Sequence, residues 1–519
     1  METRTVKAAR NIFWGYAANL IRIILEFVLR TIFIAQIGNT YLGINGLYTN
    51  ILGMLALSEL GIGTSMSYSL YKPIAEGNIE KIKSLMKLFK NAYRVIATVV
   101  AVVGIIIIPF LPYIINGVDN ISQNDLILFY VIYLFNTVTT YFVSYKYSLV
   151  NAYQQNYVIT KLEMYFKCIT IVVQAIMLLW LKSFLAYLIS QSIVGIIQKI
   201  FSAVYIDKKY PFLKDNSSFP LDTEDKELLK NNVKGNLIHK LGEVAICQTD
   251  NIIISSFIST KLVGYVSNYT LIINAVSTFT NAVFNSLTSS YGNFIASEEK
   301  KRQEELLYVN QFLSFIVFGF VTIMLYILTQ PFIALWLGEA QKIDNISCAL
   351  IMLNVYFTGE RVMLVNYKTA AGIFLQDRWI TLTRSIVNIA VSVALVFIIG
   401  LPGVYIGTFI QGIISNLFLP NVVYKNMFSK SAKKYYINSV KYVISIAVVL
   451  TVSSVMANMI SDKSTIFHFV LLMIMTLFFM VVFYILLYRK NQYNLLLMQK
   501  IKNLLVRQRG NKNEKDDKD

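Results

Sequence analysis

Apolar runs long enough to cross a lipid bilayer recur along the whole chain and are separated by short polar segments. A membrane-spanning helix needs about 20 apolar residues, and the runs lack the alternation of apolar and polar residues that marks the strands of a membrane β-barrel. Hydrophobic residues make up 56% of the 519-residue chain and charged residues only 15%. We therefore expect an all-α, polytopic membrane protein, because a helix satisfies its backbone hydrogen bonds within one lipid-embedded segment.

The positions of the runs predict about fourteen transmembrane helices. They lie approximately at residues 11–36, 41–71, 86–113, 125–149, 157–180, 183–206, 231–257, 263–293, 306–336, 347–374, 378–400, 402–425, 437–460 and 465–488. Lysine and arginine are concentrated in both tails and in every second connection. Because an even number of spans puts both termini on one side, the positive-inside rule places both in the cytoplasm. The net charge of +18 then reflects membrane orientation and does not indicate nucleic-acid binding.

The two halves of the chain are related in sequence at a spacing of 221 residues, as from position 43 to position 264. Residues that coincide at this spacing lie in several different helices and loops: Gly43 and Gly264, Tyr48 and Tyr269, Thr49 and Thr270, Gly117 and Gly338, Gln155 and Gln376, and Thr160 and Thr381. A fixed period of this kind indicates an internal duplication. Because each copy would contain six helices, both copies start on the same side, as parallel repeats related by an axis along the membrane normal.

The duplication predicts the domain organisation. We expect an N-terminal lobe of helices 1 to 6 in residues 1–206, a cytoplasmic linker at 207–230, and a C-terminal lobe of helices 7 to 12 in residues 231–426. Helices 13 and 14, at 427–488, form a C-terminal pair outside the two lobes, and residues 489–519 form a basic cytoplasmic tail. The tail mixes leucine with lysine and arginine, which is typical of a helix on the anionic inner membrane surface.

Ionisable residues lie near the middle of several predicted spans. Arg22, Glu26 and Arg30 recur at i, i+4 and i+8, which places them on one face of the first helix. A charge at the bilayer centre costs about 3 kcal/mol on insertion scales, so this face is expected to line a protein interior or a watery cavity. The other members of this group are Glu59, His239, Lys240, Glu243, Asp250, Glu360 and Arg361.

Two interpretations fit these charges. In the first, they line a central hydrophilic cavity between two lobes, where cations bind an anionic substrate and carboxylates couple to a cation or hold the cations in place. In the second, interhelical salt bridges, such as Arg22 with Glu26 or Glu243, only lock the bundle. We favour the cavity for the set as a whole, because charges inside a membrane are costly and tend to be functional.

Six further charged residues lie toward the cytoplasmic helix ends: Lys146, Lys161, Glu163, Lys167, Lys368 and Arg384. Snorkelling of the side chain to the interface is the usual explanation for such residues, and we favour it over an entry vestibule for a phosphate headgroup.

The sequence contains no nucleotide-binding loop, zinc-ligand spacing or nucleophile motif. Its three cysteines, Cys168, Cys247 and Cys348, lie in or beside apolar spans, which indicates ordinary packing residues and not a disulfide framework. We therefore expect no enzymatic activity, no catalytic residues, no metal site and no bound cofactor.

The layout as a whole resembles a known family. The resemblance rests on fourteen spans in two six-helix halves plus a terminal pair, on a charged first helix in each half, and on a Pro-Phe then Gly pattern that closes helices 3 and 9 (residues 109–117 and 331–338). These features resemble the polysaccharide-transporter branch of the multidrug/oligosaccharidyl-lipid/polysaccharide exporter superfamily, and more narrowly the bacterial Wzx-type flippases.

This resemblance implies a function and a setting. Such proteins move an undecaprenyl-pyrophosphate-linked oligosaccharide repeat unit across the bacterial cytoplasmic membrane by alternating access, for capsule, O-antigen or exopolysaccharide assembly. The implied partners are the lipid-linked oligosaccharide, membrane lipids, and the polysaccharide polymerase and glycosyltransferases of the same pathway.

Roles for the charged residues also follow from the resemblance. Contacts to the pyrophosphate or to acidic sugars are expected from the cations Arg22, Arg30, Lys240 and Arg361. Coupling to a proton or sodium gradient, or positioning of those cations, is expected from the carboxylates Glu26, Glu59, Glu243, Asp250 and Glu360.

Other functions compete with this prediction. A multidrug or cation antiporter of the same superfamily would normally lack helices 13 and 14, whereas a lipid II flippase also keeps arginines in its cavity. A membrane glycan polymerase needs a sizeable loop for catalytic groups, and the predicted outer loops are short. A scaffold without transport activity predicts that neutralising the charges in the middle of the spans leaves polysaccharide export intact.

Overall fold

The computed structural model describes residues 4–55, 62–118, 120–215, 242, 244–286, 288–373, 376–459 and 465–499. Every regular element within these ranges is a helix, which confirms the all-α fold. Ten of the described helices are long and apolar enough to cross a membrane, as expected of a polytopic membrane protein. The total of fourteen spans stays a prediction, because the spans expected at 41–71 and 231–257 lie partly outside the described residues.

The chain divides into two compact units. Unit 1 comprises residues 1–267 and 389–404, and unit 2 comprises residues 268–388 and 405–519. The predicted linker at 207–230 lies mostly outside the described residues, so the predicted lobe boundaries stay predictions.

The helices of unit 1 follow one another closely along the chain. They are α1 (Arg4–Leu55), α2 (Ile62–Ala75), α3 (Ile79–Ile107), η2 (Ile108–Phe110), α4 (Leu111–Ile114), α5 (Gln123–Ala152), α6 (Asn156–Leu181), α7 (Phe184–Lys209) and η3 (Pro211–Lys214), with a further helical segment at 244–257. Within α1, Gly38 adopts a φ of 80°, a backbone conformation that glycine tolerates best. This kink confirms the break predicted between the first two spans.

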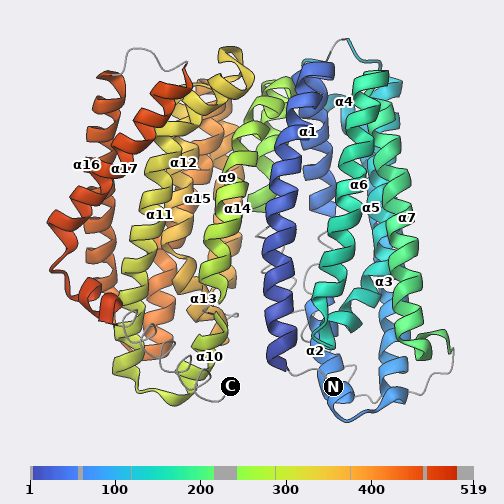
Figure 1. Cartoon of the computed structure of the whole chain (residues 1–519), viewed down its shortest axis with the longest axis horizontal. Coiled ribbons are helices and arrows are strands. Elements are labelled where there is room, and N and C mark those ends of the chain that lie inside the picture. The colour runs from blue at the N-terminus through green and yellow to red at the C-terminus, as the bar shows by residue number, and fades with distance from the viewer. Residues whose placement is uncertain are drawn as a thin grey trace, which may run out of the picture. The chain divides into compact units, whose positions relative to one another are not determined.

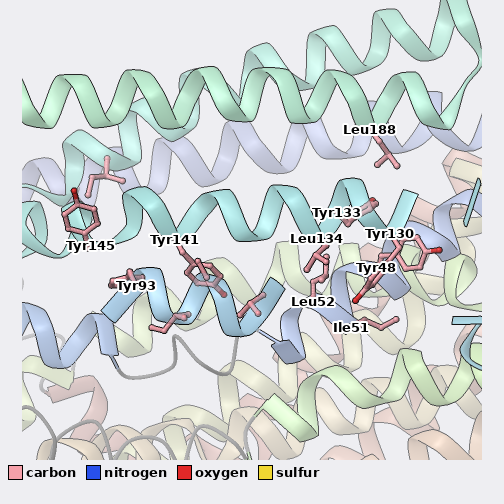
Figure 2. Packing of buried hydrophobic residues seen from close by; sticks show 14 of the residues in the cluster. Tyr48, Ile51, Leu52, Tyr93, Tyr130, Tyr133, Leu134, Tyr141, Tyr145 and Leu188 are labelled. Atoms are coloured by element: carbon pink, nitrogen blue, oxygen red, sulfur yellow. The ribbon is translucent and has the colours of Figure 1, made fainter. Parts of the chain in front are cut away.

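Packing in unit 1 places α1 alongside α6, while α5 lies against α3 and α7 (Figure 1). Buried tyrosines join α1, α3 and α5. Tyr48 and Tyr130 form an edge-to-face pair with ring centroids 5.4 Å apart, and Figure 2 shows the two rings close together in the core. Their hydroxyl groups donate to the carbonyl oxygens of Leu126 and Gly104, at 2.8 and 3.1 Å. These bonds satisfy polar atoms that would otherwise be costly in an apolar core.

Two glycines mark a close helix crossing within unit 1. A Cβ atom on Gly43 would collide with the carbonyl oxygen of Thr260, and a Cβ atom on Gly264 would collide with the carbonyl oxygen of Asn39. Asn39 and Thr260 are separated by the same 221 residues as the two glycines. Surfaces related by a two-fold axis make contacts that are reciprocal in this way. The crossing therefore supports the internal duplication predicted from the sequence.

Unit 2 contains the following helices, three of which also contribute residues to unit 1. They are α9 (Thr260–Ser286), α10 (Thr288–Ser297), α11 (Lys300–Leu337), η4 (Glu339–Gln341), α12 (Asn345–Glu360), α13 (Val362–Ala370), α14 (Arg378–Ile399), α15 (Leu401–Phe428), α16 (Lys433–Met459) and α17 (Ile466–Tyr488). The C-terminal pair, α16 and α17, packs against α11 (Figure 1). At this contact the rings of Phe315 and Tyr442 stack with centroids 4.4 Å apart.

Candidate functional site

A polar cavity of about 920 Å³ lies inside unit 1, between α1, α5, α6 and α7. Amide and hydroxyl groups form much of its polar wall, including those of Asn19, Asn45, Asn136, Thr140, Gln174 and Gln191. Helices that present polar groups in the middle of a membrane span need a protein interior or water to satisfy them. The cavity is therefore the strongest candidate for a binding site among the described residues.

Helical periodicity brings these polar groups together. The residues that α5 contributes to the wall are Tyr133, Asn136, Thr137, Thr140 and Tyr141. Their spacing of i, i+3, i+4, i+7 and i+8 places them on a single face of the helix. The same helix also packs against α2, α3 and α7.

Among the described residues, five charged side chains line the cavity: Arg22, Glu26, Glu163, Lys167 and Lys199. Lys167 on α6 forms an ion pair with Glu26 on α1, with Nζ and Oε1 3.4 Å apart. Once this pair is set aside, two cations and one carboxylate remain on the wall. The described part of the cavity wall therefore carries an excess of positive charge.

Lys199 reaches from α7 to α5. Its Nζ atom donates hydrogen bonds to the carbonyl oxygen of Asn136, at 2.8 Å, and to Oγ1 of Thr139, at 2.7 Å. The side chain of Asn136 donates from Nδ2 to Oγ of Ser192 on α7, at 2.8 Å. These bonds join the two helices directly at the cavity wall.

Hydrogen bonds between neighbouring side chains also orient the amide groups of the wall. Nε2 of Gln174 on α6 donates to Oε1 of Gln191 on α7, at 3.1 Å. The hydroxyl of Tyr133 donates to Oδ1 of Asn45. Each amide retains at least one further donor or acceptor after these bonds, so the wall can exchange hydrogen bonds with the hydroxyl groups of a polar ligand.

The charged face predicted for the first helix divides between two environments. Arg22 and Glu26 line the cavity, and Glu26 pairs with Lys167 rather than with Arg22. Arg30 is half-buried outside the cavity wall, and its Nη1 donates to Oγ of Ser267 on α9 at 2.7 Å.

Glu360 and Arg361 lie in unit 2, where α12 gives way to α13. Both side chains are buried. The carboxylate of Glu360 accepts hydrogen bonds from Nδ2 of Asn416, at 3.2 Å, and from the hydroxyl of Ser439. Arg361 donates from Nη1 to Oδ1 of Asn416, at 3.1 Å. One amide on α15 thus bridges the predicted coupling carboxylate and the neighbouring predicted substrate cation.

Three predicted site residues lie outside the described part of the chain: Glu59, Lys240 and Glu243. Asp250 is half-buried in the helical segment 244–257. Beside it, Gln248 accepts from Nδ2 of Asn50 at 2.6 Å, and Asn251 donates to Oδ1 of Asn50 at 2.9 Å. This amide ladder ties the segment to the second half of α1.

The snorkelling predicted for lysines near the cytoplasmic helix ends is wrong at two positions. Lys146 pairs with Asp207 of α7 at 2.6 Å, and its side chain is only 10% exposed. Lys368 pairs with Asp377, and these side chains are 4% and 6% exposed. A carboxylate from a neighbouring element keeps each ammonium inside the protein, which removes the reason to reach for the interface. Glu163, also in this predicted group, lines the cavity together with Lys167.

Lys199 lines the cavity but is not among the site residues predicted from the sequence. A usable signal was present in α7, where Gln191, Gly195 and Gln198 recur at helical spacing next to Lys199. Together with the polar face of α5, this stripe marks two consecutive helices that turn toward the same polar space.

Comparisons with known proteins agree with this architecture. Residues 8–288 match the model of a family described as polysaccharide biosynthesis protein. Among proteins with curated descriptions, none matches this sequence. Several solved structures share the fold. The lipid II flippase MurJ, in an inward closed conformation, is similar with a TM-score of 0.63 and 14% identity, over 93% of this chain and 99% of that chain.

Two MATE transporters are similar as well. An inward-facing multidrug resistance MATE family transporter of the MOP superfamily gives a TM-score of 0.57 at 12% identity, over 78% of this chain and 97% of that chain. A mutant of the Vibrio cholerae MATE transporter VcmN gives 0.57 at 15% identity, over 82% and 98%. At such identities these likenesses show that the fold is shared. Since the family model matches more than half of the sequence, this chain belongs to the polysaccharide biosynthesis protein family.

Proposed function

We propose that this protein is a flippase that translocates a polyprenyl-pyrophosphate-linked oligosaccharide repeat unit across the bacterial cytoplasmic membrane. The product would feed the assembly of a surface polysaccharide such as a capsule, O-antigen or exopolysaccharide. Both termini would lie in the cytoplasm, and the pathway's glycosyltransferases and polymerase would act before and after translocation.

The observation that carries this proposal is the polar cavity of unit 1. At about 920 Å³ it lies near the upper end of the usual range for ligand pockets, about 300–1,000 Å³. Its amides, hydroxyls and excess positive charge suit a headgroup with many hydroxyl groups and negative charge. A cavity for lipophilic cationic drugs would favour apolar walls and carboxylates, so the lining supports a flippase over a multidrug antiporter.

The predicted residues would divide the work. Arg22 in the cavity, with Arg30, Lys240 and Arg361, would contact the pyrophosphate or acidic sugars as the two halves change conformation. Glu360, which is buried at the break between α12 and α13, would couple transport to a proton or sodium gradient together with Glu26, Glu59, Glu243 and Asp250. Binding of the headgroup and of the coupling ion would each shift the balance between inward-open and outward-open states.

A vesicle assay tests the proposal. The purified protein is reconstituted with a polyprenyl-pyrophosphate-linked oligosaccharide, and lipid-linked sugar reaching the far leaflet is measured with an impermeant lectin. We expect Arg22→Ala to slow translocation by about 10- to 100-fold, because a hydrogen bond to a charged group is worth about 1.5–3 kcal/mol. Arg94→Ala, which removes an exposed arginine of α3 outside the cavity, should leave translocation unchanged.

The same vesicles separate the alternatives. Translocation that persists when ionophores abolish both ion gradients would reject the coupling role of the carboxylates. Export of cationic drugs without any movement of lipid-linked sugar would select the antiporter, and transport restricted to lipid II would select the lipid II flippase. Equal translocation by folded Arg22→Ala and the unmodified protein would reject the cationic cavity as the headgroup site.

A further inference from the structure

The proposed function counts Lys199 only as part of the positive charge of the cavity and gives it no individual role. We infer that Lys199 is an anion-binding residue of the unit 1 cavity in addition to Arg22, and that it binds an anionic oxygen group of the cargo headgroup, either a carboxylate of an acidic sugar or a phosphate. This inference rests on the proposed function, because it assumes that the cavity receives a saccharide headgroup.

The contacts of Lys199 leave its charge available. An ammonium group has three N–H donors, and two of them go to the carbonyl oxygen of Asn136 and to Oγ1 of Thr139. Both acceptors are neutral, and within the described part of the chain no carboxylate lies within ion-pair distance of this Nζ atom. One donor and the full positive charge therefore remain for a ligand in the cavity.

Three other lysines of the chain, by contrast, each form an ion pair with a carboxylate. Lys146 and Lys368 are buried and pair with Asp207 and Asp377. Lys167, in the same cavity as Lys199, pairs with Glu26. A lysine whose task is only to hold helices together gains from a carboxylate, since a desolvated charge without a counter-ion is expensive. The neutral partners of Lys199 indicate that its counter-ion arrives with the ligand.

The position of the ammonium is fixed before any ligand binds. Asn136 and Thr139 lie one helical turn apart on α5, and the side chain of Asn136 is itself tied to Ser192 on α7. Two acceptors on α5 thus fix the ammonium group of Lys199, which belongs to α7. A group fixed in this way loses little conformational entropy when it binds, which strengthens its contact with a ligand.

The surroundings favour an anion that is part of a saccharide. Thr140, Gln191 and Gln198 line the cavity on the same two helices, and their hydroxyl and amide groups match sugar hydroxyls. Tyr141, also on the wall, offers an aromatic ring with a polar tip. A site for a small inorganic ion would need neither this number of neutral polar groups nor this volume.

A binding experiment on the full-length protein in detergent tests the inference without any translocation. Three probes are compared by calorimetry at millimolar concentration: a hyaluronan tetrasaccharide, which carries carboxylates, neutral chitotetraose, and inorganic pyrophosphate. Lys199→Gln should weaken the binding of an anionic probe by about tenfold or more and change chitotetraose binding less than twofold. Lys199→Arg should restore most of the loss. Lys208→Gln, an exposed lysine on the same helix, should change nothing.

The pattern across the probes names the source of the anion. A loss confined to the tetrasaccharide assigns Lys199 to a sugar carboxylate, and a loss confined to pyrophosphate assigns it to the linking phosphate. The inference is overturned if a Lys199→Gln protein that elutes and unfolds like the unmodified protein binds both anionic probes as tightly as the unmodified protein does. It is also overturned if the unmodified protein binds neither anionic probe. If the vesicle assay finds no flipping while these affinities hold, the proposed function fails and the anion site stands.

Discussion

An almost fully buried lysine is costly unless a negative charge lies beside it, and Lys368 has such a partner. Its side chain and that of Asp377 are both almost fully buried. Removing one member of such a pair leaves the other charge desolvated and uncompensated, whereas replacing both with apolar residues of similar size is often close to neutral. The pair thus links the end of α13 to the start of α14. Its contribution to stability becomes evident when one partner is removed, because the remaining charge is then buried without a counter-ion.

Breaking this pair should therefore destabilise the protein strongly. We expect Lys368→Met to lower the free energy of unfolding by about 3–5 kcal/mol, and the double change with Asp377→Leu to recover most of that loss. Denaturant unfolding in detergent measures both. The control is Lys342→Met, which breaks a pair with the 70% exposed Glu339 and should cost less than about 1 kcal/mol. Similar losses for the Lys368 and Lys342 variants would contradict the argument.

Part of the candidate site could be predicted at this scale. The i, i+4 spacing of Arg22 and Glu26 was enough to place both on a polar face, and both line the cavity. The partner of Glu26 could not be predicted, because it depends on how α1 packs along α6, which brings Lys167 within 3.4 Å. Spacing along one helix predicts a face, whereas ion pairing depends on the neighbour that covers it.

At the scale of elements, the close crossing of Gly43 and Gly264 is a packing constraint that no apolar run reveals. Run lengths predicted the separate spans and the break near Gly38, which the structure places at that residue. They did not predict the break between α12 and α13, because the sequence there reads as one continuous apolar span around Glu360 and Arg361. A break at a glycine between two apolar runs, such as Gly38, can be predicted from the sequence. A break stabilised by hydrogen bonds from another helix, such as those of Asn416 to Glu360 and Arg361, cannot be predicted in this way.

The crossing predicts that adding a methyl group lowers the stability of the protein at Gly43 but not at Gly15. Gly43→Ala places a Cβ against the backbone of Thr260, and because backbone cannot move aside alone, the helices must separate. We expect a loss of about 1–3 kcal/mol in unfolding free energy, as for other overpacked sites. Gly15→Ala, in the same helix but with no atom within 4 Å of the new Cβ, should be neutral or gain up to about 1 kcal/mol. Equal stabilities for the two variants would show that the helices do not approach this closely.

For the whole molecule, the duplication and the orientation in the membrane constrain each other. Two parallel six-helix repeats require every second connection to face the same side, and the charge bias assigns that side to the cytoplasm. If a span were missing from the first repeat, the connections of the second would be inverted with respect to those of the first. Equivalent connections in the two halves therefore test the span count and the orientation together.

Cysteine labelling makes this test in intact cells. Starting from a variant in which Cys168, Cys247 and Cys348 are replaced by serine, single cysteines are introduced at four exposed positions: Glu76, Asn124, Ala340 and Ser431. An impermeant thiol reagent should modify Asn124→Cys and Ala340→Cys before lysis, since both follow odd-numbered spans. Glu76→Cys and Ser431→Cys should react only after the membrane is opened. Because Asn124 and Ala340 lie in different halves, labelling of one without the other would refute parallel repeats, whereas labelling of Glu76→Cys and Ser431→Cys alone would keep the repeats and invert the protein.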